Sequence, residues 1–296
     1  MNRKDMFQDQ LFALTTIIQT KYTEGGVAYT GTASGFYYTV LTPSDPKNTG
    51  PQWNRIDGQW LITNKHVILQ KVNGKNHLVD EFTFCLREIV GNRVNWLPIT
   101  IKHDEILEKT RVHQEDNIDI VAIDVSKNIE AKLLEGAKTG RQIMVPVALS
   151  NKNLPDNQPL TVDVTSDIVV ASYPKGFYDD VNKFPIVKSG IIASGWGMQF
   201  KGNSLFEIDA QLFPGSSGGL VISKPTNFAL FDGCLHKSET KQFVFLGVYS
   251  GEYVWEEETA NIDGTKSFQK RSYGLGNVWY SYLIPEIVDV GKRLTD

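Results

Sequence analysis

Short runs of β-branched and aromatic residues, separated by turn-forming residues, are the feature that most constrains the fold of this chain. Such runs are typical of β-strands. They occur at residues 27–41, 60–63, 81–90, 95–101, 118–125, 168–172, 186–193, 205–212, 219–223, 243–250 and 274–280. A polar stretch at 151–159, which contains two prolines, separates them into two groups. The pattern predicts an all-β protein of two barrels or sandwiches, with domains 1–150 and 151–296.

Helical patterns occur mainly at the two ends of the chain. Phe7, Leu11, Leu14 and Ile18 have helical spacing, which predicts a short amphipathic helix over about the first 18 residues. We also expect a helical turn at 129–134 and a closing helix within 283–294. Residues 42–51 read as a loop, and the segments 225–241 and 252–271 read as surface loops.

Composition limits the classes of function. The chain has 296 residues, 41% hydrophobic and 22% charged, and a formal net charge of -4. These values are ordinary for a soluble globular protein and argue against a dedicated nucleic-acid or anionic-membrane binder. The N-terminus lacks the apolar run of a signal peptide, and two cysteines, Cys85 and Cys234, make no disulfide framework. We therefore expect a cytoplasmic protein with buried, reduced cysteines.

Residues 213–222 form a turn that leads into an apolar strand. Phe213, Pro214 and Gly215 are followed by two serines and two glycines, and then by the run Leu-Val-Ile. The pattern displays a hydroxyl at a tight turn. Ser217, which directly precedes the two glycines, is the preferred nucleophile, and Ser216 is its rival.

A serine hydroxyl needs a base to take its proton and a carboxylate to orient that base. Of the five histidines, only His66 directly follows a strand-like run and precedes an apolar pair. Asp119 lies between Ile118 and Ile120, so its carboxylate should be partly buried and need a partner. Asp116 and Asp124 are the rival acids.

The segments 63–67, 119–121 and 214–219 resemble, in this order, the His, Asp and Ser motifs of the chymotrypsin-like serine proteases. The likeness is closest to bacterial HtrA-type and related trypsin-like peptidases. Residues 172–176, 209–215 and 245–251 also resemble corresponding segments of that family. The resemblance covers about residues 25–290.

The resemblance implies two six-stranded antiparallel β-barrels and a triad of His66, Asp119 and Ser217. It further implies an oxyanion hole formed by the backbone N–H groups of Gly215 and Ser217. The expected substrate is a protein or peptide, and no cofactor, metal, nucleic acid or membrane is expected.

The chain departs from the digestive trypsins at two points. Ser216 stands where those enzymes have an aspartate that pairs with a newly cut N-terminus, so this chain cannot form that ion pair. We therefore expect the turn either to hold its active conformation at all times or to be ordered by a substrate or a regulatory protein partner. Gln211 stands six residues before Ser217, where an acid would select basic substrates. We expect Gln211, Ser250, Gly251 and Glu252 to contact substrate, with Glu252 as either a pocket acid or a solvated loop acid.

From this resemblance we expect a serine endopeptidase, and a regulatory one with few substrates. Three other functions compete with this prediction. The first is a catalytically silent, protease-like scaffold that binds protein partners. The second is an α/β-hydrolase-type acyl hydrolase, which the order of the histidine and the serine disfavours. The third is metal binding through Cys234 and His236, which lack a second pair of ligands nearby.

Overall fold

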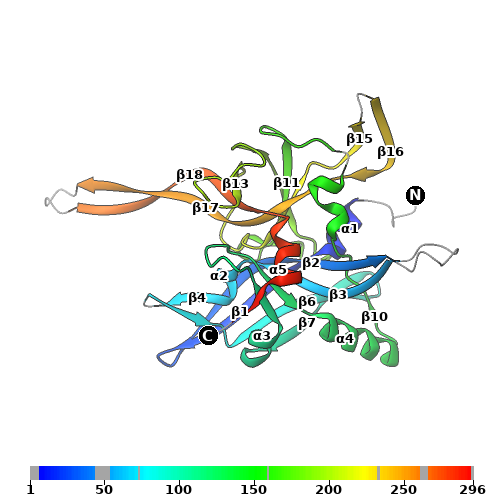
Figure 1. The fold of residues 1–296 in the computed structure, drawn as a ribbon. Helices are drawn as coiled ribbons and strands as arrows, with labels where there is room; N and C mark the ends of the chain where they lie inside the picture. Colours follow the sequence, from blue (N-terminus) through cyan, green and yellow to red (C-terminus); the bar gives the residue numbers. More distant parts are fainter. Residues whose placement is uncertain are drawn as a thin grey trace.

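The computed structural model describes residues 7–43, 54–72, 74–158, 160–231, 234–260 and 266–294. Antiparallel sheets dominate it, and the prediction of an all-β fold with a six-stranded barrel is confirmed (Figure 1). The expected loop at 42–51 lies mostly outside the described residues. The polar stretch after 150 forms two short 3₁₀ helices, at Asn151–Asn153 and Pro155–Asn157.

A nine-stranded sheet forms the N-terminal half. Its order is β10-β6-β1-β2-β3-β9-β8-β19, and β7 pairs with β6. Its strands are β1 (Thr15–Glu24), β2 (Val27–Pro43), β3 (Asn54–Thr63), β6 (Glu81–Val90), β7 (Arg93–Lys102), β8 (Thr110–Val112), β9 (Val121–Asp124), β10 (Gln142–Ile143) and β19 (Lys292–Arg293). A separate hairpin pairs β4 (Leu69–Val72) with β5 (Lys75–Leu78). The sheet surrounds a buried cluster that includes Tyr37, Leu61, Phe82 and Ile123, which is consistent with the predicted first barrel.

A closed barrel forms the C-terminal half. Its order is β11-β12-β13-β18-β17-β14. Its strands are β11 (Asp167–Ser172), β12 (Ile186–Ile192), β13 (Leu205–Asp209), β14 (Gly219–Ser223), β17 (Phe245–Ala260) and β18 (Lys266–Tyr280). Alternate residues, among them Phe206 and Ile208, fill its interior, as the two-residue period of a strand requires.

The two halves share a buried apolar layer. It contains Phe36 and Ile62 from the N-terminal sheet and Leu220 and Phe245 from the barrel. The rings of Phe36 and Phe245 meet edge to face, with centroids 5.3 Å apart. Because each ring is fully buried, each contributes on the order of 2 kcal/mol to holding the halves together.

The helices differ in length from the prediction. They are α1 (Phe7–Leu14), α2 (Lys65–Ile68), α3 (His103–Lys109), α4 (Ser126–Thr139) and α5 (Leu283–Val290). The expectation of a helix over the first 18 residues was wrong beyond Leu14, because Ile18 lies in β1, where it pairs with Ala33. The chain after α5 returns to the N-terminal half, where β19 pairs with β8.

The segments predicted to be surface loops, 225–241 and 252–271, are mainly hairpins instead. Residues of the first form β15 (Thr226–Phe231) and β16 (Cys234–Gln242). The second continues β17 and β18 into a long two-stranded projection (Figure 1). The described side chains of both hairpins are mostly exposed, so these segments show no alternation of buried and exposed residues by which the sequence could predict a strand.

Cys85 is a buried free thiol, and burial raises its pKa to about 12. The side chains of Cys234 and His236 lie outside the described residues. In the described ranges, every helix is too short or too polar to cross a bilayer.

Candidate active site

His66 lies on α2, the short helix that follows the end of β3. Val67 and Ile68 of this helix are buried, which turns the imidazole toward the surface, where 48% of the side chain is exposed. The imidazole Nδ1 is 2.7 Å from Asp119 Oδ2. The backbone N–H of His66 also donates to Asp119 Oδ1, at 2.9 Å.

Asp119 lies just before β9, between two buried isoleucines, as its sequence neighbours indicated. Burial alone would raise the pKa of its carboxyl group, but the hydrogen bonds and charge of His66, together with the Ser250 hydroxyl, hold that pKa below its ordinary value. The Ser250 Oγ donates to Asp119 Oδ2 at 2.6 Å. Asp119 therefore remains ionised while both of its oxygens accept hydrogen bonds.

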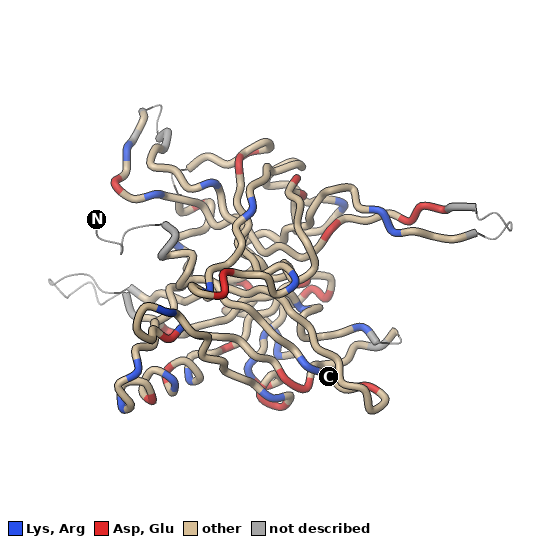
Figure 2. Tube along the Cα trace, turned by 180° about the vertical axis from the view of Figure 1, so that it is seen from behind, with Lys and Arg blue, Asp and Glu red and all other residues tan. Residues whose placement is uncertain are grey.

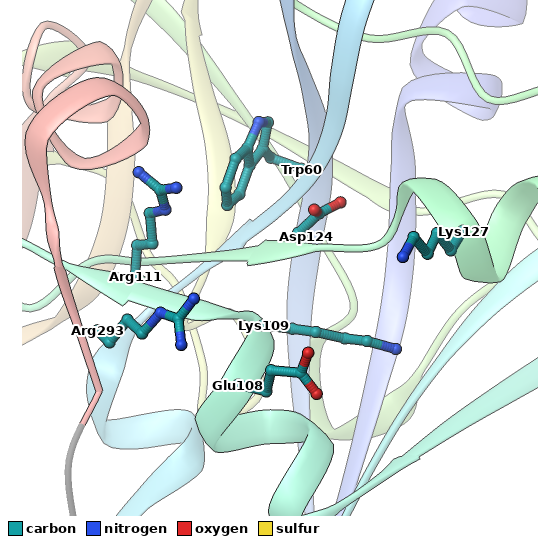
Figure 3. A pocket seen from close by; sticks show the side chains of 7 residues that line it. All are labelled: Trp60, Glu108, Lys109, Arg111, Asp124, Lys127 and Arg293. Carbon is teal, nitrogen blue, oxygen red and sulfur yellow. The ribbon is translucent and has the colours of Figure 1, made fainter.

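The two rival acids lie elsewhere. Asp116 is exposed and pairs with Lys292 at 2.6 Å. Asp124 accepts hydrogen bonds from the N–H and the hydroxyl of Ser126 at the start of α4. Asp124 also lines a separate cavity of about 200 Å³ (Figure 3). The residues lining it are Trp60, Glu108, Lys109, Arg111, Asp124, Lys127 and Arg293, so it shares none with the cluster of His66, Asp119 and Ser217.

The two serines of the turn have different surroundings. Ser216 is fully buried, and its Oγ accepts a hydrogen bond from Ser172 Oγ at 3.1 Å. Ser217 is partly exposed, and its Oγ donates to the carbonyl oxygen of Ser250 at 3.0 Å. Ser250 thus contacts Ser217 through its carbonyl and Asp119 through its hydroxyl.

The carbonyl groups of the turn are anchored by the rest of the molecule. Lys175 N–H donates to Pro214 O at 2.7 Å, and Ser34 Oγ donates to Gly215 O at 2.8 Å. Ser34 N–H donates to Ser217 O, also at 2.8 Å. In contrast, the N–H groups of Gly215 and Ser217 donate to no acceptor in the described part of the protein. Two donors are therefore available to a ligand at this turn.

Glycine is required at two positions of the turn. Gly215 has φ +91° and Gly218 has φ +79°, in the region that side chains rarely adopt. A Cβ atom on Gly218 would also overlap the backbone oxygen of Ser34. Backbone conformation and space therefore both exclude a side chain there.

The predicted substrate-contacting residues lie on two segments. Ser250, Gly251 and Glu252 are consecutive on β17, and Glu252 is exposed opposite Gly276 of β18. Gln211 follows β13 and is exposed, and its carbonyl oxygen accepts a hydrogen bond from Lys188 Nζ at 2.6 Å.

Sequence reasoning missed the residues that support this cluster. Asn64 Nδ2 donates to Asp119 O at 2.8 Å, while Asn64 Oδ1 accepts the N–H of Gly218 at 2.5 Å. Ser34 joins the N-terminal sheet to the turn, as described above. Asn64 lies two residues from His66 and Ser34 precedes Gly35, but neither residue type signals such a long-range contact.

Glu207 on β13 is a buried acid without a partner. Its side chain is 1% exposed, and in the described residues neither carboxylate oxygen has a hydrogen-bond partner. Burial raises its pKa from 4.5 to about 7, against a smaller opposing effect of Lys201. Its charged form is thus disfavoured by folding.

We expect the stability of the protein to fall as the pH rises from about 4.5 to 7. Between the two pKa values the folded chain keeps a proton on Glu207 that the unfolded chain has released, so the free energy of unfolding should drop by about 3 kcal/mol. Urea unfolding at a series of pH values measures this drop. Glu207→Gln should remove most of it, whereas the exposed Glu130→Gln should not. An identical pH profile for wild type and Glu207→Gln would contradict the assignment.

The sequence matches the trypsin-like peptidase domain family over residues 34–228. The chain therefore belongs to the trypsin-like peptidases, a family whose members act on proteins or peptides. This confirms the resemblance drawn from the three motifs.

Three solved protease structures resemble this chain. The active form of the Rv3671c protease from M. tuberculosis is 14% identical, with a TM-score of 0.42, and the match covers 97% of this chain and 85% of that chain. The MamO protease domain from Magnetospirillum magneticum, in its apo form, is 10% identical, with a TM-score of 0.41, and the match covers 97% of this chain and 98% of that chain. The tobacco vein mottling virus protease is 12% identical, with a TM-score of 0.41, and the match covers 89% of this chain and 79% of that chain. No curated protein matches the chain.

Proposed function

We propose that this protein is a serine endopeptidase in which Ser217 is the nucleophile, His66 the general base and Asp119 the orienting acid. The observation that carries the proposal is a continuous set of contacts from His66 Nδ1 to Asp119, from Asp119 to the Ser250 hydroxyl, and from the Ser250 carbonyl to Ser217 Oγ. Ser216 is excluded from this set, because it is buried against Ser172.

In the proposed reaction, the Ser217 hydroxyl turns from Ser250 O toward His66 Nε2, which takes its proton as Oγ attacks the peptide carbonyl. His66 then gives that proton to the departing amine, which leaves an acyl-enzyme. Water, deprotonated by His66, attacks the ester and releases the acid. Asp119 stabilises the imidazolium in both steps.

The free N–H groups of Gly215 and Ser217 would hold the oxygen that becomes negative during attack. A donor of this kind typically contributes about 10²–10³ in rate. Because Ser34 and Lys175 already anchor the turn, we propose that it holds its active conformation before substrate binds and needs no cleaved N-terminus. The hairpins β15–β16 and β17–β18 add surface to the barrel that could limit access to the site, which favours a regulatory protease with few substrates.

A catalytically silent scaffold that binds protein partners is the second candidate. The observation in its favour is that Ser217 Oγ donates to Ser250 O, with no hydrogen bond to His66 in the described residues. Catalytic contacts are often loose before substrate binds, so this geometry is also compatible with an active enzyme.

Labelling with a fluorophosphonate probe separates the two candidates. We expect folded wild-type protein to be labelled, with the adduct mapped by mass spectrometry to Ser217. Ser217→Ala should not be labelled, whereas Ser216→Ala, if folded, should be. A folded wild-type protein that resists the probe would favour the scaffold, and an adduct on Ser216 would overturn the assignment of the nucleophile.

A further inference from the structure

The cavity that contains Asp124 lies toward the β8–β19 end of the N-terminal sheet. Its volume is about 200 Å³, and residues of β3, α3, β8, β9, α4 and β19 line it (Figure 3). Four of the lining side chains are basic and two are acidic. The chain as a whole has a net charge of -4, and Figure 2 shows its basic and acidic residues interspersed over most of the molecule. The cavity therefore gathers positive charge locally in an acidic protein.

Two arginines of this cavity are neighbours across a strand pair. Arg293 of β19 lies directly opposite Arg111 of β8 in the antiparallel register. Side chains at such opposite positions share one face of the sheet, and like charges there repel each other. In the described part of the chain, no carboxylate oxygen lies within 4.0 Å of either guanidinium group. The fold thus brings two positive charges together without an ion pair to balance them.

Structural contacts account for Arg111 but not for Arg293. Arg111 Nη1 donates to Val288 O at 3.0 Å, and its guanidinium group lies 5.4 Å from the centroid of the Trp60 ring. These contacts hold Arg111 in place and occupy only one of its five N–H donors. Arg293 is exposed, and within the described residues its side chain has no hydrogen bond, ion pair or ring contact. The Arg293 guanidinium therefore adds repulsion without a compensating contact, as expected of a group that binds an anion.

The other charged side chains of the cavity are held by neighbours or lie across from the two arginines. Lys109 Nζ pairs with Glu105 at 2.7 Å. Asp124 is held by the hydrogen bonds at the start of α4, so it is not among the groups that we expect to bind an anion. Lys127 extends into the cavity from the side opposite to the arginines, and Glu108 lies between them (Figure 3). The arginine pair is thus the anion-binding end of the cavity, and the space beyond it is polar.

The chemistry of two adjacent guanidinium groups favours phosphate as the anion. Guanidinium groups bind phosphate through paired, parallel N–H bonds. A phosphate monoester carries about two negative charges at pH 7 and three acceptor oxygens, whereas a carboxylate carries a single charge and two oxygens. A cavity of 200 Å³ holds about seven water molecules, which is room for a phosphate group and a short organic group. Size and polarity therefore both favour a small, polar phosphate ester.

We propose that Arg111 and Arg293 bind the phosphate group of a small, polar phosphate monoester in this cavity. The site shares no side chain with the cluster of His66, Asp119 and Ser217, so the inference does not depend on the proposed function. Only the folded chain brings the two arginines together, because they come from strands far apart in the sequence. The ester should therefore bind the folded chain alone and stabilise it.

Isothermal titration calorimetry on the full chain tests the proposed site. The probes are glycerol phosphate and glycerate, which carry a phosphate and a carboxylate on similar hydroxylated chains. We expect glycerol phosphate to bind with one molecule per chain, and glycerate to bind about tenfold more weakly. Arg293→Gln should weaken the binding of glycerol phosphate about tenfold. The matched control is Arg93→Gln, an exposed arginine at the start of β7, which should change the affinity less than about twofold.

Thermal unfolding distinguishes a binding role of Arg293 from a structural one. Without ligand, the Tm of Arg293→Gln should equal or exceed that of wild type, because one of two repelling charges is removed. Glycerol phosphate should raise the Tm of wild type and have little effect on that of Arg293→Gln. A clearly lower Tm of the ligand-free variant would show a structural role and overturn the proposal. It would also be overturned by an absence of binding, by equal affinity of wild type and Arg293→Gln, by equal affinity for glycerate, or by tighter binding of a phosphoserine peptide.

Discussion

Asp119→Asn is expected to slow the reaction of Ser217 with a fluorophosphonate by about 10³–10⁴-fold. The carboxylate accepts hydrogen bonds from the His66 ring, the His66 backbone and the Ser250 hydroxyl. An asparagine of the same shape presents an NH₂ group, which favours the wrong tautomer of the imidazole and cannot balance its positive charge. The rate constant of labelling measures the effect without knowledge of the natural substrate.

The rival acid provides the matched control for this substitution. Asp124→Asn changes a carboxylate that bonds to Ser126 at the start of α4, so the labelling rate should stay within about twofold of wild type. Unfolding curves of the two variants show that each is folded under the conditions of labelling. Equal labelling rates for Asp119→Asn and wild type would remove Asp119 from the proposed mechanism.

Gly218→Ala is expected to lower the free energy of unfolding by about 4 kcal/mol and to abolish labelling. Part of the loss, about 1–2 kcal/mol, comes from the positive φ of +79°. The remainder comes from the new Cβ, which would overlap Ser34 O and Thr63 Oγ1 and push the turn away from its anchors. Urea unfolding, followed by circular dichroism, gives the free energy.

Gly26→Ala separates these two contributions. Gly26 has nearly the same φ, +81°, but its Cβ would meet nothing within 4 Å. This variant should lose only the conformational part and keep full labelling. If Gly218→Ala were no less stable than Gly26→Ala, the close packing of the turn against Ser34 would be refuted.

Most strands of the N-terminal sheet and of the barrel could be predicted from the sequence because their apolar residues face a core. The predicted ranges 81–90 and 219–223 coincide with β6 and β14. β1 was missed because its first four residues, Thr15 to Ile18, are all buried and so do not alternate. The outer parts of β17 and β18, residues 254–258 and 267–272, were missed for the opposite reason, since most of their side chains are exposed.

The sequence by itself determined most of the strands that face a core, the order of the three motifs and the glycine-rich turn, because these depend on near neighbours along the chain. The tertiary structure decided which side chains of that pattern meet. It buries Ser216 against Ser172, places Asp119 rather than Asp116 or Asp124 beside His66, and anchors the turn through Ser34 and Asn64. These contacts join residues far apart in the chain, and their geometry depends on how the sheet and the barrel pack together, which no local pattern records.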